Sequence, residues 1–314
     1  MKLCVAGAGA IGTRHLKALA CIEGVEVASL IDLDGKAREV AARFGIPHYS
    51  AELAEGLAQS GVVAAVLATP TPIHAAQVAE CLRRGKHVVV EIPMADTLAD
   101  AEALLALQRQ TGLVAMAAHT RRFNPSHQWI HQRIAAGELV VQHLVVQTYF
   151  MRRSNTNALG QPRSWTDHLL WHHACHTVDL FAYQAGEPIT DVNAMRGPLH
   201  PVLGIAMDMS LQLRTASGAL CTLSLSFNND GPFGTVFRYI CDNGTFLARY
   251  DDLFDGYDKP IDIAHVAASP NGIELQDREF VAAIREGREP NASFAQVLPA
   301  MRVLAQADAM LSSS

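Results

Sequence analysis

Unbroken apolar runs alternate with segments of helical period over the first 120 residues. Five such runs are short and apolar enough for buried strands, at residues 2–6, 25–31, 62–68, 86–91 and 114–118. Between them, residues 73–84 and 97–110 have helical patterns, and Thr97 with Asp100 matches a capping box. Unbroken apolar strands that alternate with helices predict a doubly wound parallel sheet covered on both faces.

The period of the pattern changes after about residue 121. Apolar and polar residues alternate over 205–214 and again over 219–227, and residues 235–241 add a third strand. Two helical stretches follow, at about 272–286 and 293–310. This half therefore predicts an α+β domain with an open, mainly antiparallel sheet.

The two patterns predict two domains. Residues 1–120 form an α/β domain of the Rossmann type, and residues 121–314 form the α+β domain, whose last helices can pack back on the first. A chain of 314 residues is long enough for two domains with substantial cores.

A glycine-rich turn follows the first strand at once. It reads Gly7-Ala8-Gly9-Ala10-Ile11-Gly12, and a helical pattern starts near Thr13. In a dinucleotide site Gly7 permits the tight turn, Gly9 lets the backbone approach a pyrophosphate, and Gly12 lets helix and strand pack closely. The helix N-terminus offers unpaired N–H groups to the phosphates. Asp32, at the end of the second apolar run, is spaced to bind a ribose 2′-OH.

Composition narrows the class of protein. Apolar residues make up 49% and charged residues 18% of the chain, which is typical of a globular protein, and the formal charge of −6 argues against wholesale nucleic-acid binding. No apolar run approaches the roughly 20 residues of a membrane span, and the apolar N-terminus fits a first strand better than a signal peptide. Six scattered cysteines without C-x-x-C spacing indicate reduced thiols and a cytoplasmic location.

Histidines gather in the second half of the chain, between residues 163 and 179. In a helix His168, His172 and His176 would share one face, and Asp179 could orient His176. Histidine titrates near neutral pH, so these residues, with the adjacent His173, are candidates for the proton acceptor of a hydride transfer. Two alternatives stay open: a metal site, because His-x-x-x-His is a ligand spacing, and histidines that only fill a domain interface.

Arginines form a second set near the expected junction of the two halves. They are Arg121, Arg122, Arg152, Arg153 and Arg163. Guanidinium groups bind carboxylates bidentately, so several arginines around one site favour a substrate with more than one carboxylate. A solvated surface role remains possible for each arginine singly.

These motifs resemble the glucose–fructose oxidoreductase and inositol dehydrogenase family. The matching segments are the Gly7–Gly12 turn, Thr69-Pro70 with His74, Glu91-Ile92-Pro93, Arg122-Phe123-Asn124-Pro125 and His176-Thr177-Val178-Asp179. The resemblance implies a nicotinamide dinucleotide bound by the first domain, with Ala10, Ile11, Thr69, Pro70, His74, Glu91 and Pro93 among its contacts. It also implies a substrate-binding second domain whose sheet makes a homodimer interface, with nicotinamide and substrate meeting between the domains.

The chain departs from the family pattern at two positions. The usual Glu-Lys-Pro reads Glu91-Ile92-Pro93, and the usual aspartate four residues before the catalytic histidine is His172. A lysine normally helps the substrate hydroxyl lose its proton, and Ile92 cannot. The ordinary sugar-alcohol mechanism is therefore not expected here.

Longer strings are similar to a narrower group within the family. They lie at residues 119–128, 163–173, 225–232 and 274–280. This group acts on the cyclic hemiacetal of a ring-opened dicarboxylate and forms 2-pyrone-4,6-dicarboxylate, in the protocatechuate 4,5-cleavage route for lignin-derived aromatics. The two carboxylates of this substrate agree with the arginine set. We therefore expect His176, His173 and His172 as catalytic residues, and Arg122, Arg152, Arg153, Arg163 and Trp165 as substrate ligands.

Cofactor choice depends on the end of the second strand. Asp32 favours NAD because a carboxylate repels a 2′-phosphate, whereas the narrower resemblance implies NADP. Leu33 brings no positive charge, although Lys36 and Arg38 lie nearby. We expect NAD to be used well and leave NADP open. We expect no resident metal. A non-catalytic dinucleotide sensor and a metal-dependent hydrolase built on His168, His172 and His176 remain as alternatives.

Overall fold

The computed structural model divides into two compact units. It describes residues 1–32, 37–156, 160, 162–163 and 165–312, so Leu33, Lys36 and Ser164 lie outside the described residues. Unit 1 comprises Met1–Ala118 with Ile273–Leu298, and unit 2 comprises His119–Gly272 with Pro299–Ser314. The two units are described separately. Their binding roles stay predictions at this point.

Unit 1 is built on a six-stranded parallel sheet in the order β3-β2-β1-β4-β5-β6. The strands are β1 (Lys2–Ala6), β2 (Glu26–Ile31), β3 (His48–Ser50), β4 (Val62–Leu67), β5 (His87–Val90) and β6 (Ala115–Ala117). Strands β1, β4 and β5 are almost wholly buried, which explains their unbroken apolar sequences. The predicted doubly wound Rossmann sheet is confirmed.

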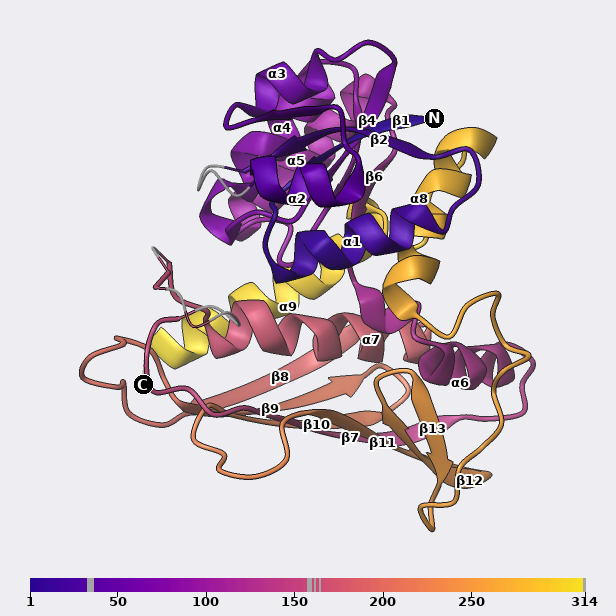
Figure 1. Cartoon of the computed structure of the whole chain (residues 1–314). Helices are drawn as coiled ribbons and strands as arrows, with labels where there is room; N and C mark the ends of the chain where they lie inside the picture. The colour runs from indigo at the N-terminus through magenta and orange to yellow at the C-terminus, as the bar shows by residue number, and fades with distance from the viewer. Residues whose placement is uncertain (33–36, 157–159, 161, 164, 313–314) are drawn as a thin grey trace. The chain divides into compact units, whose positions relative to one another are not determined.

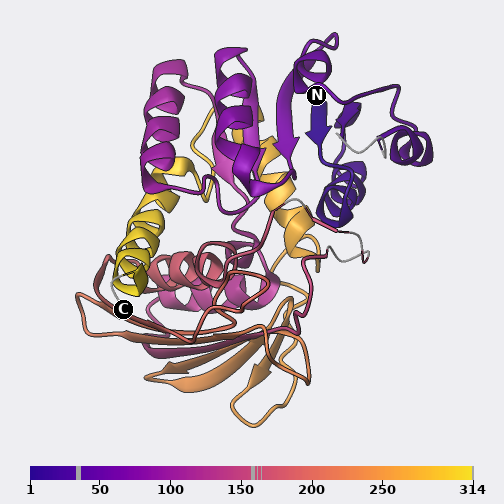
Figure 2. The ribbon, with the colours of Figure 1, turned by 90° about the vertical axis from the view of Figure 1, so that its left-hand side faces the viewer.

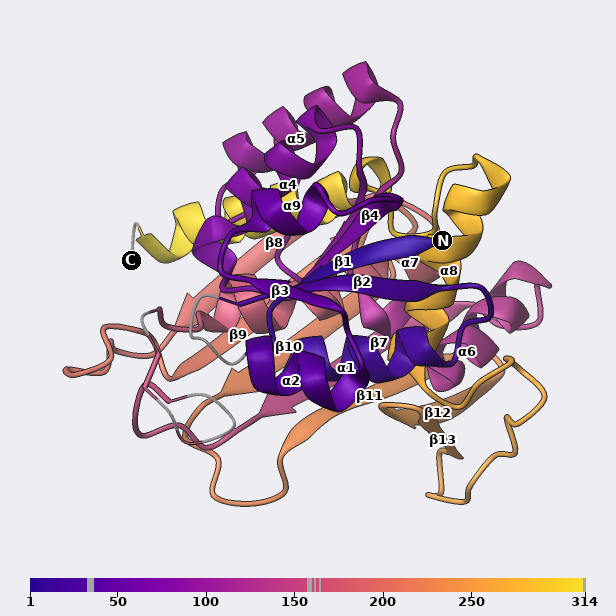
Figure 3. The same cartoon turned by 45° about the horizontal axis from the view of Figure 1, so that its top comes forward.

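Helices cover both faces of this sheet. They are α1 (Ala10–Ala20), α2 (Ala37–Phe44), α3 (Leu53–Leu57), the short 3-10 helix η1 (Thr71–Ile73), α4 (His74–Arg83), α5 (Leu98–Thr111), α8 (Gly272–Glu286) and the start of α9 (Phe294–Ser312). Helices α1 and α2 lie on one face, and α4 and α5 lie on the other (Figure 3). The capping box is confirmed, because the Asp100 N–H donates to the Thr97 hydroxyl over 3.1 Å.

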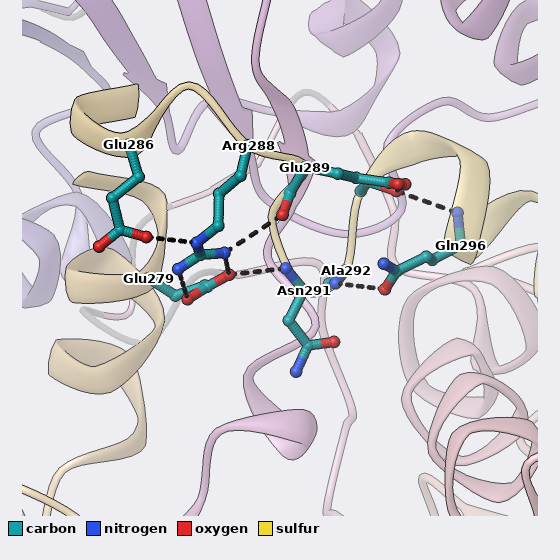
Figure 4. Close-up of polar contacts among 8 residues, drawn as sticks. Glu279, Glu286, Arg288, Glu289, Asn291, Ala292 and Gln296 are labelled. Atoms are coloured by element: carbon teal, nitrogen blue, oxygen red, sulfur yellow. Dashed lines mark hydrogen bonds and ion pairs between the residues drawn. The ribbon is translucent and has the colours of Figure 1, made fainter. Parts of the chain in front are cut away.

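The connection from α8 to α9 is fastened to the edge of the sheet. The Arg288 guanidinium donates to both oxygens of Glu279, at 2.6 and 2.8 Å, and to Glu286 (Figure 4). The Asn291 N–H donates to the same Glu279 carboxylate over 2.7 Å. One residue later, the Ala292 carbonyl accepts the N–H of Ala117 in β6. The helices predicted at the end of the chain therefore add to unit 1 as well as to unit 2.

Unit 2 is built on a seven-stranded sheet in the order β13-β12-β11-β7-β10-β9-β8. The strands are β7 (Val141–Tyr149), β8 (Ile189–Arg196), β9 (Asp208–Thr215), β10 (Leu220–Ser226), β11 (Gly234–Cys241), β12 (Gly244–Arg249) and β13 (Asp252–Asp255). The predicted open, mainly antiparallel sheet is confirmed. One pair, β7 with β10, is parallel, so the sheet is mixed.

Helices of unit 2 gather on one face of its sheet. They are the 3-10 helix η2 (Thr120–Arg122), α6 (Pro125–Ala135), the π-helix η3 (Leu169–Ala174), α7 (Cys175–Ala185) and the rest of α9. Figures 1 and 2 show α6 and α7 over this face, while the described part of the unit places no helix on the opposite face. In β9 every second residue is accordingly buried. Within the described chain, no helix is both long and apolar enough to cross a membrane.

Candidate functional site

The glycine-rich turn of unit 1 has the shape that a dinucleotide phosphate requires. Helix α1 begins inside the motif at Ala10, earlier than the predicted Thr13, with Gly9 as its N-cap. A Cβ on Gly7 would lie 2.2 Å from the Ala68 carbonyl oxygen, and one on Gly12 would lie 1.8 Å from the Gly7 oxygen. A Cβ on Gly9 would meet nothing within 4 Å. Two glycines therefore close the turn, and the third leaves open space at its surface.

The helix end next to that space carries no anion of its own. No side chain caps α1 through Gly9, and its first turn contains no acidic residue. Gly9, Ala10 and Ile11 are exposed. The first N–H groups of α1 and the positive end of its dipole therefore lie at an exposed surface, as a pyrophosphate site needs.

Asp32 lies at the end of β2 beside this turn. Its Oδ2 accepts the Ala8 N–H over 2.6 Å. This bond holds the carboxylate at the carboxyl edge of the sheet, where ribose binding by an acid is expected in this fold. Neither Leu33 nor Lys36, the neighbours weighed for cofactor choice, belongs to the described residues.

Two loops follow β4 and β5 at the same edge of the sheet. The His74 ring joins them, because Nδ1 lies 2.9 Å from the Pro93 carbonyl oxygen and Nε2 lies 2.8 Å from that of Thr69. The Thr69 hydroxyl donates to Gln77 over 2.6 Å. The Ile92–Pro93 peptide bond is cis. The predicted cofactor residues Thr69, Pro70, His74, Glu91 and Pro93 thus belong to two linked loops.

A buried histidine that the sequence analysis did not single out lies behind these loops. The Nδ1 atom of His15, in α1, lies 2.9 Å from both carboxylate oxygens of Asp277 in α8. Its Nε2 lies 3.0 Å from Glu91 Oε1. His15 follows the glycine turn in the sequence, but Asp277 is too distant along the chain for any local pattern to pair them.

The histidine cluster of unit 2 lies on a π-helix followed by an α-helix. His168 is extended, precedes η3, and donates its N–H to His172 Nδ1 over 2.9 Å. The expectation that His168, His172 and His176 share one face of a regular helix is therefore wrong, because the π-turn changes the spacing. Such turns recur at functional sites.

His176 lies in the first turn of α7, and its ring meets that of His119 edge to face at 6.1 Å. Within the described chain its buried Nδ1 has no hydrogen-bond partner. Burial, followed by the nearby charge of Arg121, lowers the pKa of His176 well below its ordinary value. Burial also lowers the pKa of His172, to about 4. The surroundings therefore disfavour the charged form of both imidazoles.

Arg152 and Arg163 converge on one carboxylate. Each donates to a different oxygen of Asp167, and His173 Nε2 lies 3.8 Å from that group. Burial raises the pKa of Asp167, but the contact with His173 and the charges of Arg152 and Arg163 outweigh it and hold that pKa well below its ordinary value. The buried Arg152 Nη1 and His173 Nε2 have no hydrogen-bond partner in the described chain. Two guanidinium groups face one carboxylate, so the cluster has a net positive charge, and Arg152 Nη1 is a donor without a partner among the described residues.

Aromatic rings surround these arginines and histidines. Trp165 lies under the Arg163 guanidinium at 5.1 Å and 5.3 Å from the His172 ring. Phe227 contacts both Arg152 and His173. Arg153 is exposed and donates to the Asn228 side chain over 3.0 Å. The structure thus brings together Arg152, Arg163, Trp165, His172 and His173, with Arg153 at the margin.

The role expected of Asp179 needs correction. The Asp179 carboxylate accepts Arg122 Nε and Nη2, at 2.8 and 2.6 Å, and both residues are buried. Asp179 therefore pairs with Arg122 rather than orienting the unpartnered His176 Nδ1. Arg122 uses Nε and Nη2 for this ion pair, and its role as a substrate ligand stays a prediction.

Some residues of these clusters escaped the sequence analysis. Asp167 and His119 lie within the segments 163–173 and 119–128, which resemble the family, but no periodicity distinguishes these two residues from their neighbours. Among the described residues, no three histidine, cysteine, aspartate or glutamate side chains gather as a metal site.

Family models cover both units of the chain. Residues 1–119 match the model described as "Oxidoreductase family, NAD-binding Rossmann fold", and residues 125–267 match "Bacterial oxidoreductases, C-terminal". The chain belongs to the glucose–fructose oxidoreductase and inositol dehydrogenase family. As a member, it is an oxidoreductase with a dinucleotide-binding Rossmann domain.

The chain is similar to curated relatives in sequence and to solved structures in fold over nearly its whole length. It is 61% identical over 312 residues to 4-carboxy-2-hydroxymuconate-6-semialdehyde dehydrogenase from Sphingobium sp., covering 99% of each chain. It is 27% identical to inositol 2-dehydrogenase 2 from Paenarthrobacter aurescens, covering 93% of this chain and 90% of that one. Its fold is similar to levoglucosan dehydrogenase in complex with NADH and levoglucosan, with a TM-score of 0.87, 18% identity and coverage of 100% and 97%.

The geometry of unit 1 fits the cofactor of this family. A dinucleotide supplies a nicotinamide ring that accepts a hydride. Gly9 and the start of α1 would hold its pyrophosphate, Asp32 its first ribose, and the linked loops after β4 and β5 its second half.

Proposed function

We propose that this oxidoreductase oxidises the cyclic hemiacetal of 4-carboxy-2-hydroxymuconate-6-semialdehyde to 2-pyrone-4,6-dicarboxylate with NAD or NADP. The observation that carries the proposal is the 61% identity to the Sphingobium dehydrogenase over almost the full length of both chains. The reaction belongs to protocatechuate 4,5-cleavage.

The chemistry of a hemiacetal explains the missing lysine. Its carbon carries one hydrogen and one hydroxyl group, and oxidation removes a hydride from carbon and a proton from oxygen, which leaves a lactone. The ring oxygen lone pair stabilises positive charge as it develops on that carbon. Ile92 in the family's lysine position is therefore compatible with this substrate, whereas a plain secondary alcohol needs more help to lose its proton.

His176 is the proton acceptor of the proposed reaction, with His173 as the next candidate and His172 beside them. Its buried Nδ1 has no hydrogen-bond partner in the described chain, which leaves a ring nitrogen for the substrate hydroxyl group. A positioned base of this kind contributes about 10²–10⁴-fold to a rate.

The arginine cluster around Asp167 recognises the carboxylates of the substrate. Arg152 and Arg163 are preorganised by Asp167, and the unpartnered Arg152 Nη1 is a donor available to an anion. Alanine variants of Arg152 and Arg163 should raise KM for the substrate by about tenfold or more while KM for the cofactor stays constant, because a charge-assisted hydrogen bond contributes about 1.5–3 kcal/mol. Unchanged KM and kcat in both variants would exclude this cluster.

Incubating the purified protein with the hemiacetal and either NAD or NADP tests the reaction. Absorbance of the reduced nicotinamide should rise as the pyrone dicarboxylate forms, and kcat/KM should show efficient use of NAD because Asp32 disfavours a 2′-phosphate. Cofactor binding without turnover would indicate a sensor instead, and turnover that is abolished by a chelator would indicate a metal enzyme. A strong preference for NADP would contradict the role given to Asp32.

The open face of the sheet in unit 2 is the proposed homodimer interface. The family resemblance supports this assignment, and the described helices of unit 2 leave that face uncovered (Figure 2). Sedimentation should give twice the mass of one chain, and a monomer at micromolar concentration would contradict it. The six free cysteines support a reducing, cytoplasmic setting.

A further inference from the structure

One fully buried imidazole ties together three segments of unit 1. His15, on α1, reaches Asp277 on α8 through Nδ1 and Glu91 at the end of β5 through Nε2, with all distances between 2.9 and 3.0 Å. The side chains of His15 and Asp277 are wholly buried, whereas that of Glu91 is 20% exposed. The network thus begins in the core and ends at the carboxyl edge of the sheet.

Stability alone is a poor reason for such a network. The free energy needed to remove two charges from water often exceeds the free energy gained from their attraction. Apolar residues of similar volume often stabilise a fold as much as a buried ion pair does. Burial opposes protonation of His15, yet the Asp277 and Glu91 carboxylates raise its pKa to about 10. The imidazole therefore stays charged at neutral pH and holds Glu91 by a charge-assisted contact.

The exposed end of the network lies where the second half of a dinucleotide is expected. The strand order 3-2-1-4-5-6 places one nucleotide on each side of the switch between β1 and β4. Asp32, at the end of β2, marks the adenosine side. Glu91, which follows β5 and precedes the cis Ile92–Pro93 bond, belongs to the nicotinamide side.

The loop after β5 is held at two points. His74 contacts the Pro93 carbonyl, and His15 contacts the Glu91 side chain. Helix α1 carries the phosphate-binding turn at its N-terminus, so the His15–Glu91 contact sets the loop against the helix that receives the phosphates. A fixed relation between these two parts is what places a nicotinamide ring once its pyrophosphate is bound.

We propose that His15, anchored by Asp277, is a positioning residue that fixes Glu91 and the following cis-proline turn for the nicotinamide half of the cofactor. This inference rests on the proposed use of a nicotinamide dinucleotide but not on the identity of the substrate. Neither His15 nor Asp277 contacts the cofactor in this assignment.

The test compares two ligands that share the phosphate-binding turn. NADH contains the nicotinamide, and ADP-ribose contains the adenosine and both phosphates but lacks it. In His15→Gln the Kd for NADH should rise at least about tenfold, equivalent to 1.4 kcal/mol, while the Kd for ADP-ribose should change less than about twofold. An equal rise in the Kd for both ligands would mean that the variant disturbs α1 itself. An unchanged Kd for both would mean that Glu91 does not need His15 to hold it in place. Either result would overturn the proposal.

A second variant guards against a folding defect. Because His15→Gln leaves Asp277 buried with a poorer partner, His15→Leu/Asp277→Ala removes both charges and should keep the fold. It should show the same selective loss of NADH binding, and adding Glu91→Ala should cause less than an additive further loss, since His15 and Asp277 act through Glu91. Additive losses would overturn the proposal.

A matched control comes from α4. Arg84→Ala breaks an exposed pair with Glu80 in the same unit and should leave the binding of both ligands unchanged. Titrations need no substrate, so a selective loss of NADH together with no oxidation of the hemiacetal would refute the proposed function and leave this inference standing.

Discussion

At the scale of single residues, two buried histidines differ in charge: His176 of unit 2 is neutral, and His15 of unit 1 is positively charged. Burial lowers the pKa of His176 well below its ordinary value, whereas two carboxylates raise that of His15 to about 10. Burial penalises the charged ring in both places, and only an opposite charge in contact reverses the outcome. The ring of His176 therefore stays neutral, whereas that of His15 carries a positive charge.

His176→Asn should separate chemistry from binding. Loss of the proton acceptor should lower kcat by at least about a hundredfold, while NADH binding, measured by fluorescence titration, stays intact. His173→Asn is the matched comparison and should be the milder of the two. If His176→Asn turned over at a near-normal rate, or if His173→Asn were the more damaging, the base would have to be reassigned.

His15 should make the protein less stable in alkaline solution. The pKa of His15 is about 10 in the folded protein, above the ordinary value of 6.5. Its contribution to the free energy of unfolding is therefore full below pH 6.5 and is lost as the pH rises towards 10. The carboxyl groups that face the ring are those of Asp277 and Glu91. The thermal midpoint should therefore fall between pH 6.5 and 10.

The variant His15→Leu/Asp277→Ala provides the comparison for that measurement. Other groups also titrate in alkaline solution, so the relevant quantity is the difference in slope between the two proteins. The variant should show a shallower fall in midpoint. Parallel curves would show that His15 does not carry a stabilising charge.

At the scale of elements, the glycine turn separates folding from cofactor binding. Gly9 has φ −73°, which alanine adopts, and its Cβ would enter open space. Gly9→Ala should therefore unfold at the parent temperature but bind NADH weakly, because the methyl group occupies the approach of the pyrophosphate. Gly12→Ala places Cβ 1.8 Å from the Gly7 oxygen and should lose about 1–3 kcal/mol of stability, as overpacking does.

Thermal unfolding and NADH titration of both variants check this contrast. Normal NADH binding by Gly9→Ala would show that the phosphates do not approach that residue. An unchanged midpoint for Gly12→Ala would show that the helix can shift away from the turn at little cost.

Patterns that are local in sequence predicted local structure well. Buried parallel strands leave unbroken apolar runs, so β1, β4 and β5 were recognisable, and so was the alternation of β9 and β10. The π-helix was not, because its i to i+5 bonds follow from packing rather than from a residue pattern. The spacing of His168, His172 and His176 was consequently misjudged.

At the scale of the whole molecule, pairings between distant segments lay beyond the sequence. The ion pair of Arg122 with Asp179, 57 positions later, follows from no local pattern. The pairing of His15 with Asp277 could not be predicted, because the two residues are 262 positions apart. Opposite charges on separate segments offer many possible partners, and only the tertiary fold selects one. The glycine turn was predictable because all its parts are contiguous.

The division of the chain has a consequence for engineering. The polypeptide passes between its two units three times, near residues 118, 272 and 298, so unit 1 is completed by a segment that is synthesised long after its sheet. A gene fragment that ended at residue 118 would encode every strand of that sheet. It would still omit helix α8, whose Asp277 pairs with the charged His15. Chimeras that exchange cofactor preference among relatives should therefore carry Ile273–Leu298 along with the first 118 residues, since the nucleotide-binding module is discontinuous in the gene.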